Sequence, residues 1–392
     1  MSQSREIILA SPDLSRLHDD GFELSVKEAH LLVSSVPYVT VGRTVARGTL
    51  IFPLSMASDV TVGKPKDHTA YFAGDEPYYA DGTAIAGIIN NRNVTKLADG
   101  IVAKFYFSSK PSVEDPNFDV KVRRYVEILS APARELEPGA TAQTRVIIET
   151  QDDDSPFVFL DTNSARAGIM PITAKLKGLK IAIVGLGGTG SYILDLVAKT
   201  PVKEIHLFDD DEYSLHNAYR APGAPTREQL RARMPKVNYF GEVYSRLHKG
   251  VFPHPEHITR EKLTKLAGMD YGFLSMDPGP EKAQLIEFLL SAGIAFSDTG
   301  LGVKAADDKL VGIVNTITVT PAYKSHVHKI PVKAGGDEEL YVSNIQIAEL
   351  NMLNAVMAVT RWKKHFGFYM DDRHEHECTY TIGPNMLTNE ET

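Results

Sequence analysis

The chain has 392 residues, of which 43% are hydrophobic and 23% charged, and its formal net charge is −8. These values are typical of a globular protein with two or three domains. The mild acidity disfavours a general nucleic-acid or membrane-surface binder, which needs a basic patch. No run reaches the ~20 apolar residues of a membrane span. One cysteine, Cys378, excludes internal disulfides and a four-cysteine zinc site. We therefore expect a cytoplasmic protein that binds neither nucleic acid nor membrane.

Two domains are expected on either side of an acidic run at residues 151–156. This run contains three aspartates and no apolar residue, and it ends at Pro156, which is typical of a linker or exposed loop. Residues 1–150 carry short apolar runs and no chemical motif, which predicts a smaller mixed α/β domain. Residues 151–392 are expected to form the domain that carries the chemistry.

Strands and helices are predicted to alternate after this run. The apolar patterns predict strands at 180–184, 204–208, 271–276, 294–296 and 310–319, and helices at about 189–199, 280–292 and 343–365. Continuous apolar strands separated by helices predict a mostly parallel sheet covered on both faces, which is an α/β architecture.

A glycine-rich turn follows the first of these strands. Gly185, Gly187 and Gly190 match the dinucleotide-binding fingerprint between a strand and a helix. Missing side chains let phosphates approach the amides at the positive end of the helix. Asp209 and Asp211 follow about 20 residues later, at the spacing for a ribose contact. The pattern predicts a nucleotide site, and the alternative is a tight turn without a ligand.

Further polar residues favour ATP over a nicotinamide cofactor. Asn217, Arg220 and Lys236 follow the acids, and Asp277 comes at the end of a later strand. Hydride transfer needs no such set. In adenylation, charge develops on the α-phosphate and the departing pyrophosphate, and basic side chains and a carboxylate-bound Mg²⁺ stabilise that charge.

From Arg166 to about Thr320 the sequence resembles the ThiF/MoeB and ubiquitin-activating enzyme family. That family has a Gly-x-Gly-Gly-x-Gly loop, then Asp-x-Asp, Asn-x-x-Arg, a lysine and an aspartate at a strand end. The matching residues here are Gly185, Gly187, Gly188, Gly190, Asp209, Asp211, Asn217, Arg220, Lys236 and Asp277. The resemblance implies a Rossmann-like adenylation domain that uses ATP and Mg²⁺.

The resemblance also implies roles for individual residues. The four glycines and Asp209 would lie at the nucleotide, and Asp211 would hold the ribose hydroxyls. Asn217, Arg220 and Lys236 would contact phosphates, and the two basic residues would stabilise the transition state. Asp277 would bind magnesium. Arg166 matches a family arginine that reaches the nucleotide of a neighbouring subunit, which implies a homodimer.

The sequence departs from the family at three places. Ala221 replaces a glutamine found in many relatives, and the structural zinc cysteines are missing. The region at about 322–340, where ubiquitin-activating enzymes place a nucleophilic cysteine, has none. It has Ser325 beside His326 and His328.

Three interpretations of the role of Cys378 remain open. It alternates with His374 and His376, so a strand would place all three on one face. The thiol could be a nucleophile, the three residues could bind a metal, or Cys378 could be an ordinary edge-strand residue. Without a nucleophilic cysteine, the reaction could stop at the adenylate, transfer to a hydroxyl such as Ser325, or pass directly to a partner.

The leading hypothesis is therefore adenylation of the C-terminal carboxylate of a ubiquitin-like protein in a bacterial conjugation pathway. The N-terminal domain resembles an extension of bacterial ThiF-like proteins, and we expect it to dock that protein or a conjugating enzyme. One alternative is adenylation of a sulfur-carrier protein for cofactor biosynthesis. Others are an NAD-dependent dehydrogenase and a non-catalytic scaffold.

Overall fold

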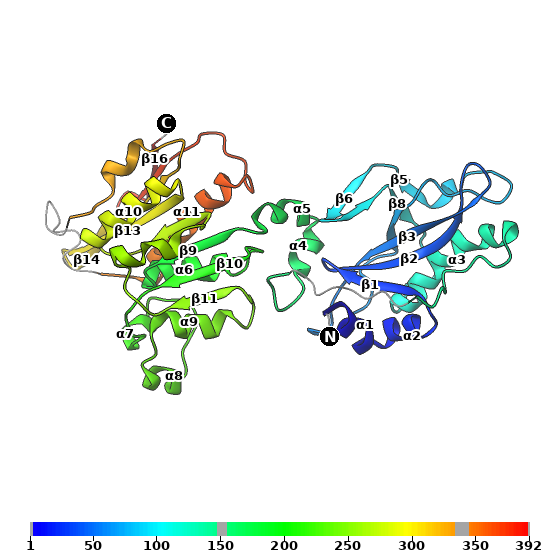
Figure 1. Ribbon diagram of the computed structural model, residues 1–392, viewed down its shortest axis with the longest axis horizontal. Helices are drawn as coiled ribbons and strands as arrows, with labels where there is room; N and C mark the ends of the chain where they lie inside the picture. Colours follow the sequence, from blue (N-terminus) through cyan, green and yellow to red (C-terminus); the bar gives the residue numbers. More distant parts are fainter. Residues whose placement is uncertain (1–2, 147–154, 334–344, 391–392) are drawn as a thin grey trace. The chain divides into compact units, whose positions relative to one another are not determined.

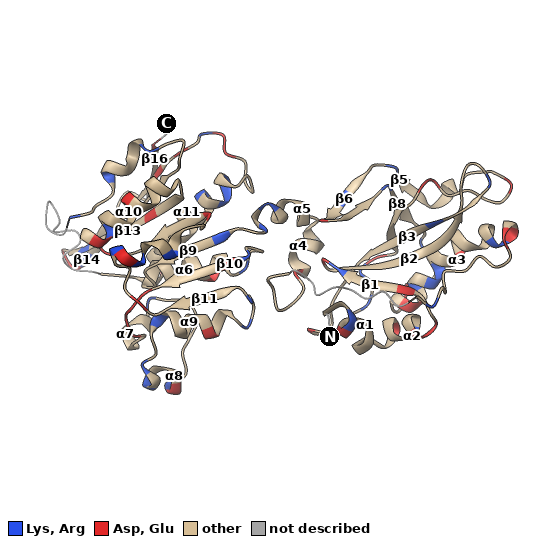
Figure 2. Ribbon diagram, viewed as in Figure 1, with Lys and Arg blue, Asp and Glu red and all other residues tan. Residues whose placement is uncertain are grey.

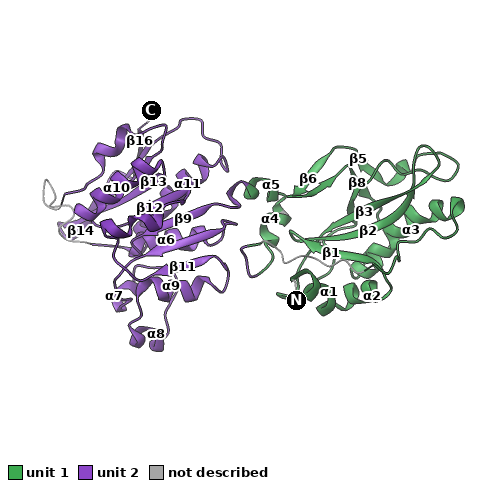
Figure 3. Cartoon of the chain, in the orientation of Figure 1, with its two compact units in different colours: residues 1–155, 159–174 green, residues 156–158, 175–392 purple. Residues whose placement is uncertain are grey.

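The computed structural model describes residues 3–146, 155–333 and 345–390. The chain divides into two compact units, coloured separately in Figure 3. Unit 1 comprises residues 1–155 and 159–174, and unit 2 comprises residues 156–158 and 175–392. Most of the run expected to be a linker, residues 151–156, lies outside the described residues.

Unit 1 is built on an antiparallel sheet of six strands in the order β1-β2-β3-β4-β8-β5, with a separate hairpin of β6 and β7. The helices are α1 (Gln3–Ala10), α2 (Pro12–Asp19), α3 (Phe118–Leu136), α4 (Thr162–Ala167), α5 (Met170–Thr173) and the 3-10 turn η1 (Ala86–Ile88). The strands are β1 (Glu23–Lys27), β2 (His30–Val39), β3 (Val45–Pro53), β4 (Thr69–Ala73), β5 (Ile89–Asn91), β6 (Thr95–Ala98), β7 (Ile101–Ala103) and β8 (Phe105–Ser108). The apolar face of α3 packs against β2 and β3, so Val122, Tyr125 and Leu129 complete the core.

Unit 2 is an α/β domain around an eight-stranded sheet (Figure 1). Its strands are β9 (Lys180–Val184), β10 (Glu204–Phe208), β11 (Val251–His254), β12 (Tyr271–Leu274), β13 (Ala295–Ala306), β14 (Lys309–Val319), β15 (Glu377–Thr381) and β16 (Met386–Glu390). Its helices are α6 (Gly188–Val197), α7 (Leu215–Ala218), α8 (Arg227–Ala232), α9 (Lys236–Tyr244), α10 (Pro280–Ala292) and α11 (Ala348–His365). Shorter turns are η2 (Ala174–Leu176), which starts at the boundary between the units, η3 (Arg260–Leu266) and η4 (Ser325–Lys329).

The sheet of unit 2 has the order β11-β10-β9-β12-β13-β14-β15-β16. The first five strands pair in parallel, and β13 to β16 pair antiparallel. Because the chain goes from β9 outward to β10 and β11 and then returns to β12 on the other side, the strand order reverses at β9. A crevice at the carboxyl ends of the strands is the expected ligand site at such a reversal.

Helices cover both faces of this sheet because β9 is apolar on both sides. Ile181 and Ile183 face a core shared with α6, α9 and α11. Ala182 and Val184 face the core formed with α10 and η3. This alternation is the pattern expected of a strand buried on both faces.

The sequence-predicted elements of unit 2 agree closely with those observed. The strands at 180–184 and 204–208 and the helix at 280–292 have the observed bounds, whereas the strand expected at 294–296 extends to Ala306. Among the described residues no helix is long and apolar enough to cross a membrane. Acidic and basic residues occur in both units (Figure 2).

Candidate active site

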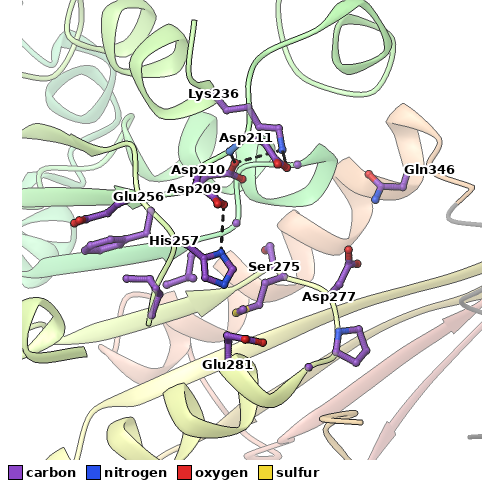
Figure 4. A pocket seen from close by; sticks show the side chains of 18 of the residues that line it. Asp209, Asp210, Asp211, Lys236, Glu256, His257, Ser275, Asp277, Glu281 and Gln346 are labelled. Carbon is purple, nitrogen blue, oxygen red and sulfur yellow. Dashed lines mark hydrogen bonds and ion pairs between the residues drawn. The ribbon is translucent and has the colours of Figure 1, made fainter. Parts of the chain in front are cut away.

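A cavity of about 410 Å³ lies where the strand order of unit 2 reverses. Its lining comes from the ends of β9, β10, β11 and β12, the start of α10 and the Arg220–Lys236 region (Figure 4). This volume falls in the range of small-molecule sites. Seven residues expected at a nucleotide or metal line this cavity, namely Gly185, Gly187, Asp209, Asp211, Arg220, Lys236 and Asp277.

The glycines of the loop serve different purposes. A Cβ at Gly185 would lie 2.3 Å from the carbonyl oxygen of Ser275, and its φ of +88° is also unfavourable for other residues. A Cβ at Gly190 would lie 1.9 Å from the carbonyl oxygen of Gly185. These two glycines therefore allow the backbone to pack against itself.

Gly187 faces open space instead. A Cβ there would meet no atom within 4 Å, and Gly187 lines the cavity. It is also the N-cap of α6, where no side chain caps the helix and the first turn has no acid. The positive end of α6 is thus free to receive an anionic group.

Both carboxylate oxygens of Asp209 accept hydrogen bonds from backbone amides. Its Oδ2 accepts a hydrogen bond from the Leu186 amide at 2.6 Å, and its Oδ1 accepts one from the Asp211 amide at 2.9 Å. The Lys236 ammonium lies 3.3 Å from Oδ1, and the Asp209 side chain is buried. Asp209 therefore ties the glycine loop to the end of β10, and few of its lone pairs remain for a ligand.

Lys236 is held beside the next acid. Its Nζ lies 2.6 Å from Asp211 Oδ2, and its amide donates to the Asp211 carbonyl oxygen at 2.8 Å. The Lys236 side chain is buried, whereas that of Asp211 is 72% exposed. The lysine charge is therefore fixed at the cavity wall, and Asp211 is accessible from solvent.

Arg220 is the basic residue with unused hydrogen-bonding capacity. Its Nε is buried and has no hydrogen-bond partner within the described residues. Burial lowers the pKa of the guanidinium, while Asp277 and Asp211 act in the opposite direction. A buried donor without a partner is costly, so a ligand that accepts from Arg220 would remove that cost.

Asp277 lies on the loop that follows β12, at the opposite side of the cavity from Lys236 (Figure 4). Within the described part of the chain, no hydrogen bond or ion pair engages its exposed carboxylate. A free carboxylate of this kind suits a hard cation such as Mg²⁺. Asp209, Asp210 and Asp211 also bring their oxygens together, but Lys236 already offsets charge in that trio.

The cavity is acidic overall. Six acidic side chains line it, against two side chains that are permanently positive, Arg220 and Lys236. Within the described ranges, Glu256 is the one acid of the lining that pairs with lysines outside it, Lys262 and Lys265. A bare polyphosphate would be repelled by this excess, so the site fits a nucleotide that carries a divalent cation.

Asn217 is not part of the cavity lining. Its Oδ1 accepts from the Ser214 amide at 2.9 Å and from Ser214 Oγ, which forms a capping box at the start of α7. The side chain is buried. Asn217 Oδ1 therefore fixes the turn that leads to Arg220.

The sequence did not single out three other residues that line the cavity. His257 Nδ1 lies 3.3 Å from Asp210 Oδ1. Glu281 lies in the first turn of α10, and Gln346 precedes α11. None belongs to a local motif, because each reaches the cavity from a separate loop or helix. Only the spatial arrangement could reveal them.

Cys378 lies on β15, away from the cavity lining. Burial raises the pKa of its thiol to about 11, and the Glu375 carboxylate adds to this. The thiol therefore stays protonated near neutral pH, which disfavours a nucleophilic role. The strand begins only at Glu377, and His374 has a left-handed φ of +52°. The expected alternation of His374, His376 and Cys378 along one strand is therefore wrong.

Two further residues were proposed from the sequence, and of these Ser325 is not among the described residues that line this cavity. The backbone of Arg166 belongs to α4 in unit 1, and its side chain is outside the described part of the structure. Ser325 begins η4, and its Oγ lies 3.4 Å from His326 Nδ1. Residues 334–344 of the expected crossover loop are outside the described ranges.

Two family models match the chain. Residues 12–162 match a domain of unknown function (DUF6791), and residues 163–331 match the ThiF family. Ubiquitin-like modifier-activating enzyme 5 of Gallus gallus is 33% identical over 105 residues, which are 24% of this chain and 26% of that protein. The chain thus spans about a quarter of the length of this curated relative.

Solved structures with a similar fold include E. coli MccB with ATP, at 16% identity and a TM-score of 0.45, covering 59% of this chain and 69% of that chain. Another is PaaA, at 16% identity and a TM-score of 0.42, covering 57% of this chain and 76% of that chain.

Proposed function

Residues 163–331 belong to the ThiF family, and from this premise we propose that the protein adenylates the C-terminal carboxylate of a ubiquitin-like protein. ATP would be the second substrate, and pyrophosphate would be released. The observation that carries this proposal is the arrangement of the cavity. An uncapped helix N-terminus, a fixed lysine, and an arginine Nε and a carboxylate that have no hydrogen-bond partner among the described residues all line one crevice.

Each residue of the cavity would have a separate role in the reaction. The amides of Gly187 and the start of α6 would bind phosphate oxygens. Arg220 would donate to the phosphate on which charge develops, and Lys236 would hold a positive charge beside it. Asp211, which is exposed beside Lys236, would accept from the ribose hydroxyls. Asp277 would bind Mg²⁺, which when present offsets phosphate charge.

In the proposed reaction a carboxylate oxygen of the protein substrate attacks the α-phosphorus of ATP. A new C(O)–O–P bond forms, and the bond between the α-phosphorus and its bridging oxygen breaks. The bridging oxygen leaves with the electron pair as part of pyrophosphate. No proton transfer is needed, so the site requires positioned charge and not a general base, which agrees with the residues present.

The dehydrogenase alternative fits the site less well. A nicotinamide enzyme uses the acid at the end of the second strand to hold ribose, and here Asp209 is occupied by two backbone amides. Hydride transfer also gives no role to Arg220 or Asp277.

Fewer observations bear on the identity of the protein substrate than on the nucleotide site. The match to a ubiquitin-like modifier-activating enzyme favours a ubiquitin-like protein, and a sulfur-carrier protein would offer the same C-terminal carboxylate. We propose unit 1 as the docking module for this substrate or for a conjugating enzyme, and a homodimer as the active form. Because Cys378 does not line the cavity and burial raises the pKa of its thiol to about 11, we propose that the adenylate is handed directly to a partner.

Calorimetric titration with ATP tests the nucleotide site. We expect binding in Mg²⁺ that EDTA removes, and no binding of NAD. Asp277→Asn should weaken MgATP binding at least about tenfold through loss of a metal ligand, with an unchanged Tm. Asp210→Asn is the matched control, since Asp210 also lines the cavity but faces His257.

Two outcomes would overturn the proposal. NAD binding without ATP binding would favour a dehydrogenase, and equal losses in both variants would remove Asp277 from its assigned role. The substrate itself is tested by ATP–pyrophosphate exchange in the presence of a purified ubiquitin-like protein. Exchange should require a free C-terminal carboxylate and disappear when that terminus is amidated.

A further inference from the structure

The first turns of α11 bring a buried amide side chain to the glycine loop. We propose that Asn351 is a positioning residue that couples the glycine loop to Arg220. The inference rests on the proposed function for its catalytic meaning, since Arg220 and the loop are the parts assigned to the phosphates. The physical coupling itself is a property of the folded chain and can be tested without a nucleotide.

Asn351 is 1% exposed and contacts both parts at once. Its Oδ1 accepts a hydrogen bond from Thr189 Oγ1, in the first turn of α6, at 3.0 Å. Its Nδ2 donates to the carbonyl oxygen of Arg220 at 3.4 Å. One planar amide therefore sets the distance between the helix N-terminus and the backbone of the arginine.

The position of the Asn351 amide also explains why residue 188 is a glycine. A Cβ at that position would lie 2.0 Å from Asn351 Nδ2 and 2.4 Å from its Cγ. Gly188 is the first residue of α6 and has no positive φ, so its backbone conformation does not require glycine. Gly188 is therefore explained by the space that Asn351 occupies.

The turn before Arg220 is anchored from its other side as well. Asn217 closes the capping box with Ser214, and the Arg220 amide donates to the Asn217 carbonyl oxygen at 3.1 Å. With Asn351 on the Arg220 carbonyl, the backbone on both sides of this arginine is fixed. A fixed backbone limits the positions that the guanidinium can reach, which is the preorganisation that charge stabilisation requires.

The same helix provides a matched control. Asn354 lies one turn further along α11 and is also 1% exposed. Its Oδ1 accepts from Thr316 Oγ1 at 2.9 Å, and its Nδ2 donates to the Gly300 carbonyl oxygen at 3.0 Å. Both asparagines thus make two side-chain hydrogen bonds, but the two bonds of Asn354 go to β13 and β14. Truncating either one should destabilise unit 2 to a similar degree.

The first test compares Asn351→Ala with Asn354→Ala by hydrogen exchange of the free protein. Asn351→Ala should speed amide exchange in peptides that cover residues 186–191 and 217–222 by about tenfold. Asn354→Ala should leave both peptides near the wild-type rate. Equal exchange in the two variants would overturn the coupling.

MgATP affinity then connects the coupling to the proposed function. Asn351→Ala should weaken MgATP binding about tenfold, and Asn354→Ala should not. If the wild-type protein does not bind MgATP, the proposed function fails, while the exchange result still decides whether Asn351 couples the two segments. If MgATP binds equally well to Asn351→Ala, the positioning role is overturned.

A suppressor experiment tests the steric part independently. Gly188→Ala should lower the Tm by several degrees because its methyl group overlaps Asn351. Adding Asn351→Ala should restore much of that Tm, since the overlapping amide is removed. The same addition of Asn354→Ala should lower the Tm further. A Gly188→Ala protein with the Tm of the wild type would contradict the packing argument.

Discussion

The buried Tyr125 of unit 1 differs from the polar residues at the cavity of unit 2 in how completely its hydrogen-bonding capacity is satisfied. In unit 1 the Tyr125 hydroxyl donates to the His68 carbonyl oxygen at 2.6 Å and accepts from the Ser109 amide at 3.0 Å. At the cavity of unit 2, Arg220 Nε is buried without a partner, and Asp277 forms no hydrogen bond or ion pair within the described residues.

This difference separates polar residues that maintain the fold from those available to a ligand. A satisfied buried group stabilises the structure, and its removal leaves a partner unpaired. A buried donor without a partner costs free energy in the empty site, which a ligand can recover. The contrast also divides the motif residues of unit 2, because Asp209 and Asn217 belong to the first kind and Arg220 to the second.

The largest expected effect comes from two glycines of one loop. Gly185→Ala should destabilise the protein by more than ~2 kcal/mol, because the new methyl overlaps the Ser275 carbonyl and φ is +88°. Gly187→Ala should cost less than ~1 kcal/mol, since its φ is −71° and the space is open. Denaturant unfolding would measure both values.

Although Gly187→Ala is expected to be the more stable of these two variants, it should have a clear effect on ligand binding. The methyl of Gly187→Ala occupies the space assigned to a phosphate, so MgATP affinity should fall at least about tenfold in a protein that folds well. Full MgATP affinity in Gly187→Ala would show that the open space at this glycine is not used.

A second pair compares Arg220→Ala with Tyr125→Phe. Arg220→Ala should weaken MgATP binding by about 10- to 100-fold, as expected for a lost charged hydrogen bond, with no loss of Tm because Nε has no partner to leave behind. Tyr125→Phe should instead cost ~1–3 kcal/mol of stability and leave MgATP affinity unchanged. Calorimetry and thermal unfolding of both variants would check this, and a Tm loss in Arg220→Ala would place Arg220 with the structural residues.

A smaller effect is expected from a satisfied histidine of unit 2. His248 is fully buried, its Nε2 lies 3.0 Å from the Val202 carbonyl oxygen, and its Nδ1 accepts from the Gly250 amide. Burial lowers its pKa, whereas the unfolded chain has a pKa near 6.5. As the pH falls below about 6.5, the unfolded state takes up the proton first, so stability is lost toward acid.

His248→Gln tests this sign. The variant should be less stable at pH 8, where the neutral imidazole makes both contacts. Between pH 6.5 and 5 its free energy of unfolding should depend less steeply on pH, by up to ~1.4 kcal/mol per pH unit, which is the contribution of one proton. An unchanged slope would mean that His248 does not titrate between the two states.

The smallest effect is expected at Cys378. Because its thiol has a pKa of about 11 and lies away from the cavity, Cys378→Ser should keep MgATP affinity and pyrophosphate exchange within about twofold of the wild type. Mass spectrometry of the reaction mixture should detect no thioester on this residue. A thioester at Cys378 would reinstate it as the nucleophile.

Several elements of unit 2, such as β9, β10 and α6, could be predicted because their signals are local, whereas β11, α7, α8, α9 and β16 were not predicted. The apolar run at β9, the glycines, the apolar face of α6 and the acids after β10 lie within about thirty residues of each other, and each part has a steric or hydrophobic cause that acts over a few residues. The order of strands in unit 1 was not predicted. Its pairing depends on contacts between segments that carry no distinguishing motif.

The local sequence could not show which motif residues are already hydrogen-bonded within the protein and which are available to a ligand. Asp209 and Asp211 look equivalent in the sequence, but one is buried against two amides and the other is exposed beside Lys236. Asn217 is predicted from the sequence to contact a phosphate, and the structure adds that its Oδ1 closes a capping box with Ser214. Hydrogen-bond partners decide these differences, and the partners belong to other segments.

The sequence by itself determined that a strand, a glycine turn, a helix and an acid follow one another, because backbone sterics and apolar periodicity act between near neighbours. Only the tertiary structure decided which polar atoms are already occupied and which face the cavity. It also brought Asn351 to Gly188 and Arg220, from 162 residues beyond Thr189 and 131 beyond Arg220. Packing at such separations is fixed by the fold of the whole unit and leaves no local pattern in the chain.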